Sequence, residues 1–414
     1  FAAWPLPPFD AWVGVPTWWP RRTSDANALA AGLLRRGDTV QVIACAPDCA
    51  TKGAIASLAG GAVLPLRALR AMPVPDEVLL ETDFDRHLVG RVIVGRAPVH
   101  QRPDRRSATI RRERHAYLVA FLADAKAPAG WLHRVRGGWM RAADVKLLQA
   151  TSFHGVDMPK LPLGFVSRRI RVRATKTAPE RIWQRYDTVQ VEAVRGGAVV
   201  TTDGARLPRD AVRIAWPRRR PLAIPKGRRW VHVDLAEQVL VAWRAGVPHR
   251  ATLISSGKAA TTTRPGLYRI LSKVRLGVMR GGGPEPYLAE SVPWIMHFWQ
   301  GQALHAAWWH DGFGAVRSHG CINLPPADAR WLFDWAVPAL PAAWRGVLVG
   351  PKDIALWVLV ERRTPPSGRA PIPPEVEIDR RCVDIGTGPR PPDCVFDLDV
   401  PKDGTVDTPR QTPR

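Results

Sequence analysis

The sequence predicts a mainly β fold, in which several small β modules precede one larger β-rich, sandwich-like domain with a short helix. Two observations indicate the modules. The string D-T-V-Q-V occurs at residues 38–42 and again at residues 187–191, each time with the alternation of a half-buried strand. Gly-Gly pairs, which are typical of tight turns, are each followed by a short apolar run and stand at 60–61, 137–138 and 196–197.

The first half of the chain is predicted to contain up to three of these modules. Their strand and turn pattern is most like that of bacterial SH3-like β-barrels. An N-terminal segment at 1–33 would precede them, and the predicted boundaries are 34–95, 96–155 and 156–222. No Cys-His or paired-carboxylate arrangement stands before Pro225, so these modules are expected to position the chain rather than to perform chemistry.

Alternating runs in the second half predict the strands of the larger domain. In the first two runs every second residue is apolar, as in half-buried strands, and the polar residues 236–238 form a plausible hairpin turn between them. A third strand ends in Ser-Ser-Gly, and a fourth contains the string T-R-P-G-L-Y-R-I. The four predicted strands are 230–235, 239–243, 252–257 and 263–270.

A helix and a tail complete the predicted order of elements. Residues 328–335 place Trp331, Leu332 and Trp335 on one helical stripe, which predicts a short helix packed behind the neighbouring loop. Residues 362–414 are rich in Pro, Asp, Thr and Arg. Such a composition favours an extended tail over a packed core.

The charge of the chain bears on its partners. The formal net charge of +23 would ordinarily raise nucleic acid as a ligand. Arginine greatly outnumbers lysine and the basic residues are dispersed, so we predict no nucleic-acid partner, although attraction to an anionic polymer remains reasonable. No apolar run approaches the roughly 20 residues of a membrane-spanning helix. The first residue is Phe, which indicates a mature or trimmed form without its export signal.

Five cysteines are present, and their spacing suggests different uses. If Cys321 is a free nucleophile, the other four fall into sequence-near pairs, Cys45 with Cys49 and Cys382 with Cys394. Such pairs fit disulfides in an exported protein, although four cysteines permit three connectivities. A zinc site is the rival interpretation, but it lacks paired C-x-x-C spacing and nearby clustered histidines.

The residues around Cys321 carry the clearest chemical signal. The ten residues 316–325 read V-R-S-H-G-C-I-N-L-P, which puts His319 two positions before the thiol and Gly320 directly before it. In a strand, residues i and i+2 share a face, so His319 and Cys321 could share one pocket. His305 stands upstream in A-L-H-A-A-W-W-H-D-G-F-G. A Cys-His pair is the minimal apparatus for acyl transfer.

Residues 286–324 resemble the signature region of the YkuD-type L,D-transpeptidases of bacterial cell walls, in which a His precedes S/T-H-G-C-x-N. The resemblance extends over about 229–361 and implies a catalytic domain at 227–361. The sequence departs from the family pattern at two positions. Pro265 stands one place later than in the family, and Ala306 occupies a position where many relatives have Gly.

The resemblance implies a role for each residue of the motif. Cys321 would be the nucleophile and His305 the base, oriented by the backbone carbonyl of Ala306. His319 would support the site, although sequence alone leaves open which histidine takes the proton. Backbone N–H groups around Gly320 and Cys321 would stabilise the oxyanion. Six further residues would bind substrate: Ser318, Asn323, Tyr287, Met296, Trp309 and Arg317.

The resemblance also implies a reaction and a location. The substrate would be a peptidoglycan stem peptide, from which Cys321 expels the terminal D-Ala before the acyl group passes to a second stem. Carbapenems would inhibit by covalent attachment, and no metal or organic cofactor is expected. The predicted location is the periplasm or cell envelope of a bacterium. Hydrolysis by an L,D-carboxypeptidase, and a non-catalytic wall-binding protein, remain as alternatives.

Overall fold

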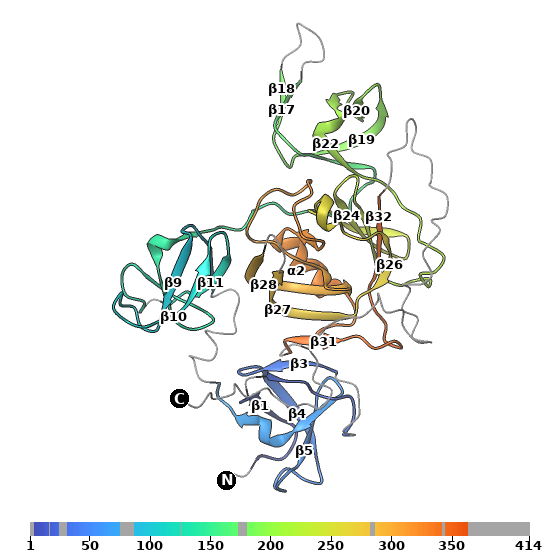
Figure 1. Cartoon of the computed structure of the whole chain (residues 1–414). Coiled ribbons are helices and arrows are strands. Elements are labelled where there is room, and N and C mark those ends of the chain that lie inside the picture. Colours follow the sequence, from blue (N-terminus) through green and yellow to red (C-terminus); the bar gives the residue numbers. More distant parts are fainter. Residues whose placement is uncertain are drawn as a thin grey trace.

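The computed structural model describes residues 4–362, apart from 16, 25–30, 75–86, 125, 173–179, 282–285 and 342–343. Figure 1 shows a central domain, coloured yellow to orange, with three smaller β units around it. We call them the first (blue), second (teal) and third (green) unit in chain order. Within the described residues the single α-helix is α2 (Pro326–Trp335), and strands dominate. The predicted mainly β class is confirmed.

The first and third units share one arrangement of strands. Each is a five-stranded antiparallel sheet, in the order β6-β5-β4-β1-β7 or β21-β20-β19-β16-β22, with a 3-10 helix before its last strand. The first contains β1 (Phe9–Val13), β4 (Thr39–Ala46), β5 (Ile55–Leu58), β6 (Ala62–Pro65) and β7 (Leu69–Ala71). The third contains β16 (Leu163–Val166), β19 (Thr188–Arg195), β20 (Ala198–Thr201), β21 (Arg206–Pro208) and β22 (Val212–Ala215), beside the hairpin β17 (Ile170–Val172) and β18 (Arg181–Trp183).

The repeated string D-T-V-Q-V marks the same position in both sheets. It opens β4 in the first unit and β19 in the third, and each is the middle strand of its sheet. The aspartate accepts an equivalent hydrogen bond in each turn, at 2.8 Å from Arg35 N–H to Asp38 and at 2.7 Å from Gln184 N–H to Asp187. The predicted internal repeat is thus a structural repeat, while its assignment to the SH3 type stays a prediction.

The second unit is divided between two sheets. Strands β9 (Arg96–His100), β10 (Thr109–Arg114), β12 (Trp131–His133) and β13 (Trp139–Arg141) form one sheet, whereas β8 (His87–Val92), β11 (Leu118–Leu122) and β14 (Val145–Leu147) join a larger one. Two predicted module boundaries do not follow the strands. Strand β1 precedes residue 34 yet pairs with β4, and β8 precedes residue 96 yet pairs with β11 and β14.

The central domain packs two sheets around α2. One sheet has the order β15-β25-β24-β23-β32-β26 and contains β15 (Val156–Asp157), β23 (Trp230–Asp234), β24 (Val239–Arg244), β25 (Val247–Leu253), β26 (Gly266–Arg269) and β32 (Trp357–Glu361). The other contains β27 (Ser272–Gly281), β28 (Tyr287–Trp299), β29 (Gln302–Ala306), β30 (Ile322–Leu324) and β31 (Gly346–Leu348). The predicted helix is confirmed, and its Leu332 lies in the core between the sheets.

Strands β23 and β24 are buried on both faces, so the expected half-buried pattern is wrong. Val231 and Leu240 belong to the core around α2, whereas Val239 and Val241 pack in a second core with Phe165 of the third unit. The neighbouring unit covers the face that was expected to meet solvent. The strand predicted at 252–257 ends at Leu253, and the chain continues toward the motif through isolated bridges.

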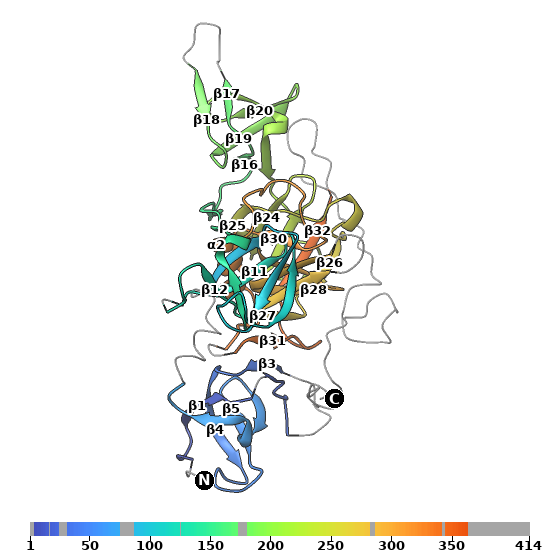
Figure 2. The same cartoon turned by 60° about the vertical axis from the view of Figure 1, so that its left-hand side comes forward.

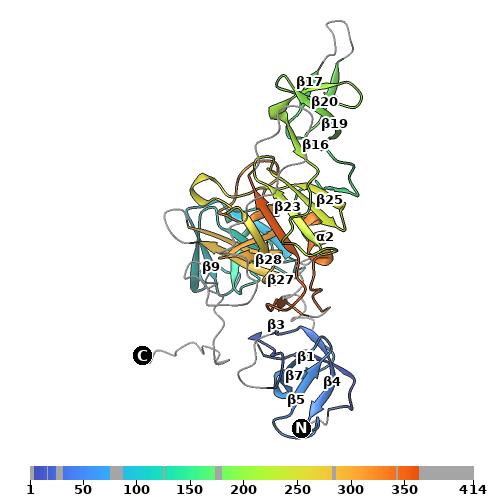
Figure 3. The same ribbon diagram turned by 90° about the vertical axis from the view of Figure 1, so that its right-hand side faces the viewer.

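One large sheet connects the central domain to the first and second units. Its order is β14-β8-β11-β28-β27-β31-β3-β2, where β2 is Thr17–Trp18 and β3 is Gly32–Arg35. Strand β11 pairs in parallel with β28, and β3 pairs antiparallel with β31. Figure 2 brings the second unit in front of the central domain, and Figure 3 shows the first and third units at its opposite ends.

Two buried ion pairs accompany these joints. At the second unit, Arg134 contacts both carboxylate oxygens of Glu290 on β28 at 2.7 Å, and its side chain is fully buried. At the first unit, Arg345 contacts Asp38 at 2.6 Å. Loss of one partner would leave the other buried charge without its nearest counterion across the joint, so each pair holds its unit against the central domain.

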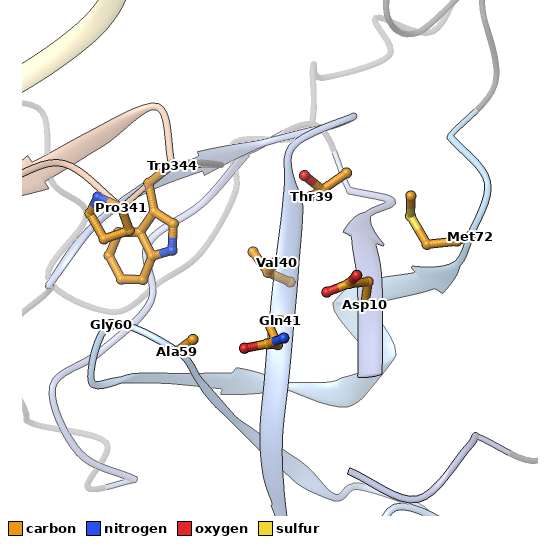
Figure 4. A pocket seen from close by; sticks show the side chains of 9 residues that line it. All are labelled: Asp10, Thr39, Val40, Gln41, Ala59, Gly60, Met72, Pro341 and Trp344. Atoms are coloured by element: carbon orange, nitrogen blue, oxygen red, sulfur yellow. The ribbon is translucent and has the colours of Figure 1, made fainter. Parts of the chain in front are cut away.

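An interfacial tryptophan also packs against the first unit. Trp344 lies in the loop before β31, and it is 3% exposed and belongs to the core of the first unit. Figure 4 shows Trp344 and Pro341 beside β4 residues of that unit, around a pocket of about 550 Å³. Cys45 and Cys49 of the first unit form the predicted disulfide. The predicted pair Cys382–Cys394 and the predicted tail lie outside the described residues, apart from residue 362.

Replacement of Arg134 by methionine tests the joint between the second unit and β28. We expect the free energy of unfolding to fall by about 3 kcal/mol, because Glu290 would stay buried without its bidentate partner. Urea unfolding followed by tryptophan fluorescence measures the change. The double variant Arg134→Met/Glu290→Gln, which removes both charges, should recover part of the loss. A loss below about 0.5 kcal/mol, as for an ordinary surface site, would contradict the assigned role.

Candidate active site

The motif histidine and the motif cysteine are brought together by a parallel strand pair. Strands β29 and β30 align Leu304 with Ile322 and His305 with Asn323. Cys321 directly precedes β30, so its thiol and the His305 ring come from adjacent strands of one sheet. The same strands carry core residues on their other face, including Leu304 and Ile322, which fix the pair against α2.

His305 is held in one tautomer by the backbone. Its Nδ1 lies 2.9 Å from the carbonyl oxygen of Ala306, which can only accept a hydrogen bond. Nδ1 therefore carries the proton, and Nε2 presents a lone pair. The side chain is buried, and burial lowers the pKa of His305 to about 4. The ring is accordingly neutral at pH 7 and able to accept a proton through Nε2.

The thiol of Cys321 is also neutral at pH 7. The residue is partly buried beside the apolar cluster formed by Leu118, Ala289 and Trp308. Burial raises the pKa of the Cys321 thiol to about 11, although a backbone hydrogen bond from Ala303 acts in the opposite direction. Its Sγ lies 3.7 Å from the carbonyl oxygen of Gly301. The resting site thus holds a neutral thiol and a neutral imidazole rather than an ion pair.

Ser318 organises the turn before the thiol. Its buried hydroxyl donates to the carbonyl of Cys321 and accepts from Gly320 N–H at 3.1 Å. The carbonyl of Gly320 accepts from the Thr263 hydroxyl at 2.8 Å, and Gly320 adopts a φ of +119°, which favours glycine. Ser318 is therefore used inside the loop rather than for substrate, and Gly320 N–H is already engaged. Of the predicted pair of oxyanion donors, Gly320 N–H thus has a partner within the loop, and the role of Cys321 N–H stays a prediction.

Asn323 is likewise occupied by the protein itself. It is buried, and its side-chain amide lies 3.1 Å from Nε2 of His310, whose Nδ1 accepts from Gly312 N–H at 3.1 Å. Burial, followed by the charge of Arg317, lowers the pKa of His310 to about 4. His310 fits the spacer between the two motif histidines, but its link to Asn323 was not predicted. The two residues fix the spacer loop to β30.

Tyr287 and His319 stand together beside the thiol. Their rings stack with centroids 4.3 Å apart, and His319 is exposed whereas Tyr287 is half-buried. Burial raises the pKa of Tyr287, and so does the charge of a neighbouring Cys321 thiolate. Among the six residues predicted to bind substrate, Tyr287 thus responds to the charge of the thiol.

The remaining three residues have different surroundings. Trp309 is partly buried, with its ring centroid 5.8 Å from that of His305, so it covers the base. Arg317 is exposed at the end of the spacer loop. Met296 is fully buried in the core with Phe298 and Leu304, so its predicted contact with substrate is wrong. On β28 both faces are covered, and sequence alternation could not show this.

The third unit clamps the spacer loop at Asp311. The hydroxyl of Tyr186 donates to the backbone carbonyl of Asp311 at 2.6 Å, and Arg185 lies 3.3 Å from its carboxylate. Arg213 donates to the carbonyl of Gly314 at 2.9 Å. Sequence reasoning missed this clamp, because its residues stand more than 100 positions before the motif.

The described residues have no cluster of His, Cys, Asp and Glu side chains that could hold a metal ion. In the same part of the chain, no helix has the length and apolar character that crossing a membrane requires.

A family model described as the L,D-transpeptidase catalytic domain, YkuD, matches residues 228–353. These residues belong to the YkuD-type L,D-transpeptidase family. The match includes His305, the spacer loop and Cys321. It begins one residue after the predicted start of the catalytic domain at 227 and ends before β32.

Relatives of this domain come from several bacteria. L,D-transpeptidase 1 of Mycobacterium tuberculosis (strain ATCC 25618 / H37Rv) is 34% identical over 101 residues, which are 22% of this chain and 40% of that protein. The catalytic domain of an Enterococcus faecium L,D-transpeptidase is 26% identical, with a TM-score of 0.27, and the match covers 33% of this chain and 98% of that one. The chain thus spans less than half the length of the curated relative.

A further solved structure similar to the chain is a complex with imipenem. The L,D-transpeptidase LdtMt1 in complex with imipenem is 18% identical, with a TM-score of 0.27, and the match covers 52% of this chain and 89% of that one.

The pH dependence of thiol alkylation tests the neutral resting state. Because the pKa of Cys321 is raised to about 11, its thiolate fraction should still grow tenfold per pH unit up to pH 10. Iodoacetamide alkylation of the full chain, followed at the Cys321 peptide by mass spectrometry, should show this slope. A short unstructured peptide with one internal cysteine, with an ordinary pKa of about 8.5, is the control and should level off earlier. A plateau for Cys321 below pH 7 would indicate a thiolate–imidazolium pair instead.

Proposed function

We propose that the chain is a cell-wall L,D-transpeptidase that joins peptidoglycan stem peptides through a Cys321 acyl-enzyme. The observation that carries the proposal is the hydrogen bond between His305 Nδ1 and the Ala306 carbonyl, next to the strand that follows Cys321. This bond leaves Nε2 as the proton acceptor on the buried ring. Membership of residues 228–353 in the YkuD family supports the same reaction class.

The proposed acylation step begins from the neutral pair. Nε2 of His305 takes the proton of the Cys321 thiol while Sγ attacks the carbonyl between the diamino-acid L-centre and the terminal D-Ala. Negative charge then develops on the carbonyl oxygen, and Cys321 N–H is positioned to stabilise it. As the intermediate collapses, the C–N bond breaks and the imidazolium returns its proton to the amine of D-Ala. A thioester on Cys321 remains.

Deacylation repeats these transfers with a different nucleophile. The side-chain amine of a second stem attacks the thioester, gives a proton to His305 and forms the new amide. The thiol leaves and recovers its proton. Water in place of the amine gives hydrolysis, so the acceptor that reaches the thioester decides between a transpeptidase and an L,D-carboxypeptidase. Neither route requires a metal or an organic cofactor.

The stacked pair of Tyr287 and His319 is proposed to contact the stem peptide, since it lies beside the thiol and includes an exposed ring. Trp309 would shield the base from water, and Arg317 would meet a stem carboxylate from the loop surface. Carbapenems would acylate Cys321 by the same attack on a strained carbonyl, and imipenem is bound by LdtMt1. This function places the protein in the periplasm or cell envelope, and the β units beside the domain would position it on the wall.

Incubation with a disaccharide-tetrapeptide tests the proposal directly. The expected product is a cross-linked dimer that has lost one D-Ala, resolved by mass spectrometry. A tripeptide product without dimer would assign hydrolysis. Absence of both products, together with retained binding to sacculi, would replace the proposal with a non-catalytic wall-binding protein.

A further inference from the structure

A second pocket lies where the first unit, the second unit and the central domain meet. Its volume is about 480 Å³, and four of its ten lining residues are arginines while one is a carboxylate. Arg35 comes from the end of β3, Arg136 from the loop after β12, Arg280 from β27 and Arg345 from the segment before β31. Arginines from three parts of the chain thus line the same pocket.

The carboxylates near this pocket are already committed to other partners. Glu290 pairs with Arg134 at 2.7 Å through both oxygens, and Arg136 reaches it only at 3.4 Å. Asp38, behind the pocket, pairs with Arg345 at 2.6 Å. Arg280 is exposed, and no carboxylate among the described residues pairs with it. Arg136 therefore shares Glu290 with Arg134, and the positive charge of Arg35 and Arg280 remains to be neutralised.

Crowding of these arginines is unfavourable in the absence of an anion. Burial lowers the pKa of the Arg35 guanidinium, and the adjacent charge of Arg345 lowers it further. Burial and Arg345 act in the same direction on Arg275, which stands next to the lining residue Leu276. An anion in the pocket would relieve this repulsion.

The pocket is separate from the candidate active site. Strands β27 and β28 pair Met279 with Ala289 and Arg280 with Leu288, so Arg280 points to the opposite face from Met279. Met279 and Ala289 pack in the apolar cluster that includes Cys321. The arginine pocket therefore opens on the far face of the strand pair that supports the thiol.

We propose that this pocket binds phosphate groups carried by an anionic chain or headgroup. Planar guanidinium groups bind phosphate oxygens in pairs, and the two uncompensated charges of Arg35 and Arg280 match an anion with more than one negative charge. The pocket is wide enough for a phosphate with its neighbouring linkage, and it is open to solvent at Arg280 and Arg136. Binding there would anchor the enzyme while leaving the thiol accessible.

Titration of the full chain with inorganic tripolyphosphate by calorimetry tests the site. The double variant Arg35→Gln/Arg280→Gln should raise the Kd at least about tenfold, because it removes two charge-assisted contacts. The matched control is Arg112→Gln/Arg114→Gln, which removes two exposed arginines of β10 that do not line the pocket. It should change the Kd by less than about threefold, with unfolding midpoints equal in all three proteins. Equal weakening in both double variants would mean diffuse charge attraction and would overturn the proposal.

Two further probes assign the source of the phosphate. Binding to a glycerol phosphate oligomer that is lost in Arg35→Gln/Arg280→Gln supports a polymer ligand. The same loss with phosphatidylglycerol vesicles supports a lipid headgroup. Binding to neither probe would overturn the proposal, as would a polygalacturonate affinity equal to that for tripolyphosphate, since this would show no selection for phosphate.

Discussion

Replacement of Cys321 by alanine is expected to abolish acyl-enzyme formation and turnover while leaving the fold intact. The reaction has no nucleophile without Sγ, and the thiol is partly buried at the edge of an apolar cluster, so its loss leaves little cavity. The measurement is mass spectrometry of the intact chain after incubation with a carbapenem. The wild-type chain should gain one adduct, located at Cys321 by peptide mapping.

Matched variants make this result specific. Cys321→Ser keeps the size of the side chain with a much weaker nucleophile, and it should also fail to form a stable adduct. The disulfide-bonded Cys45 and Cys49 should stay unlabelled in every protein. Acylation of Cys321→Ala, or an adduct at another cysteine of the wild-type chain, would refute the assignment. Unchanged thermal unfolding of the variants excludes misfolding as the cause.

Replacement of His305 by alanine should slow acylation by about two to four orders of magnitude, the usual contribution of a general base. The ring is the buried group whose Nδ1–H is fixed on the Ala306 carbonyl, so its loss removes the proton acceptor. His319→Ala is the matched control. It removes an exposed ring stacked on Tyr287 and should reduce acylation much less. Stopped-flow carbapenem acylation measures both rates.

The pH profile separates loss of a base from loss of structure. Since the pKa of His305 is lowered to about 4, wild-type acylation should fall only as the pH drops toward 4, where the ring becomes protonated. In His305→Ala this acid limb should disappear, leaving a rate that follows the thiolate fraction. If His319→Ala slows acylation more than His305→Ala does, the role of base would pass to His319.

Local patterns in the sequence were sufficient for the first hairpin of the central domain, the helix and the motif. The hairpin of β23 and β24, the helix α2 and the Cys45–Cys49 disulfide correspond to signals within a few residues of each other. The proximity of His305 to Cys321 was also accessible, because the motif fixes the length of the spacer between them.

Long-range packing accounts for what sequence reasoning missed. Met296 is buried because α2 and β29 pack over its face of β28. One face of β24 is buried because the third unit covers it. Ser318 and Asn323 are polar residues beside a nucleophile, so their pattern suits substrate contacts as well as internal hydrogen bonds. Only their burial distinguishes the two uses.

The shared sheet has a consequence for truncation. A fragment beginning near Pro225 would contain the motif residues but none of the three smaller units. Such a fragment would lose β11 from the edge of β28 and β3 from the edge of β31, and Glu290 and Arg345 would lose Arg134 and Asp38. We therefore expect the full chain to fold stably and the fragment beginning near Pro225 to be unstable.

The pairing of Arg345 with Asp38, 307 positions apart, has a consequence for biogenesis. A chain made from its N-terminus completes the first unit early, but the docking strand β31 emerges near the end of synthesis. Cys45 and Cys49, only four positions apart, can therefore be oxidised together before Cys321 exists. The order of appearance thus allows the two N-terminal thiols to pair with each other before the catalytic thiol is present to compete for either of them.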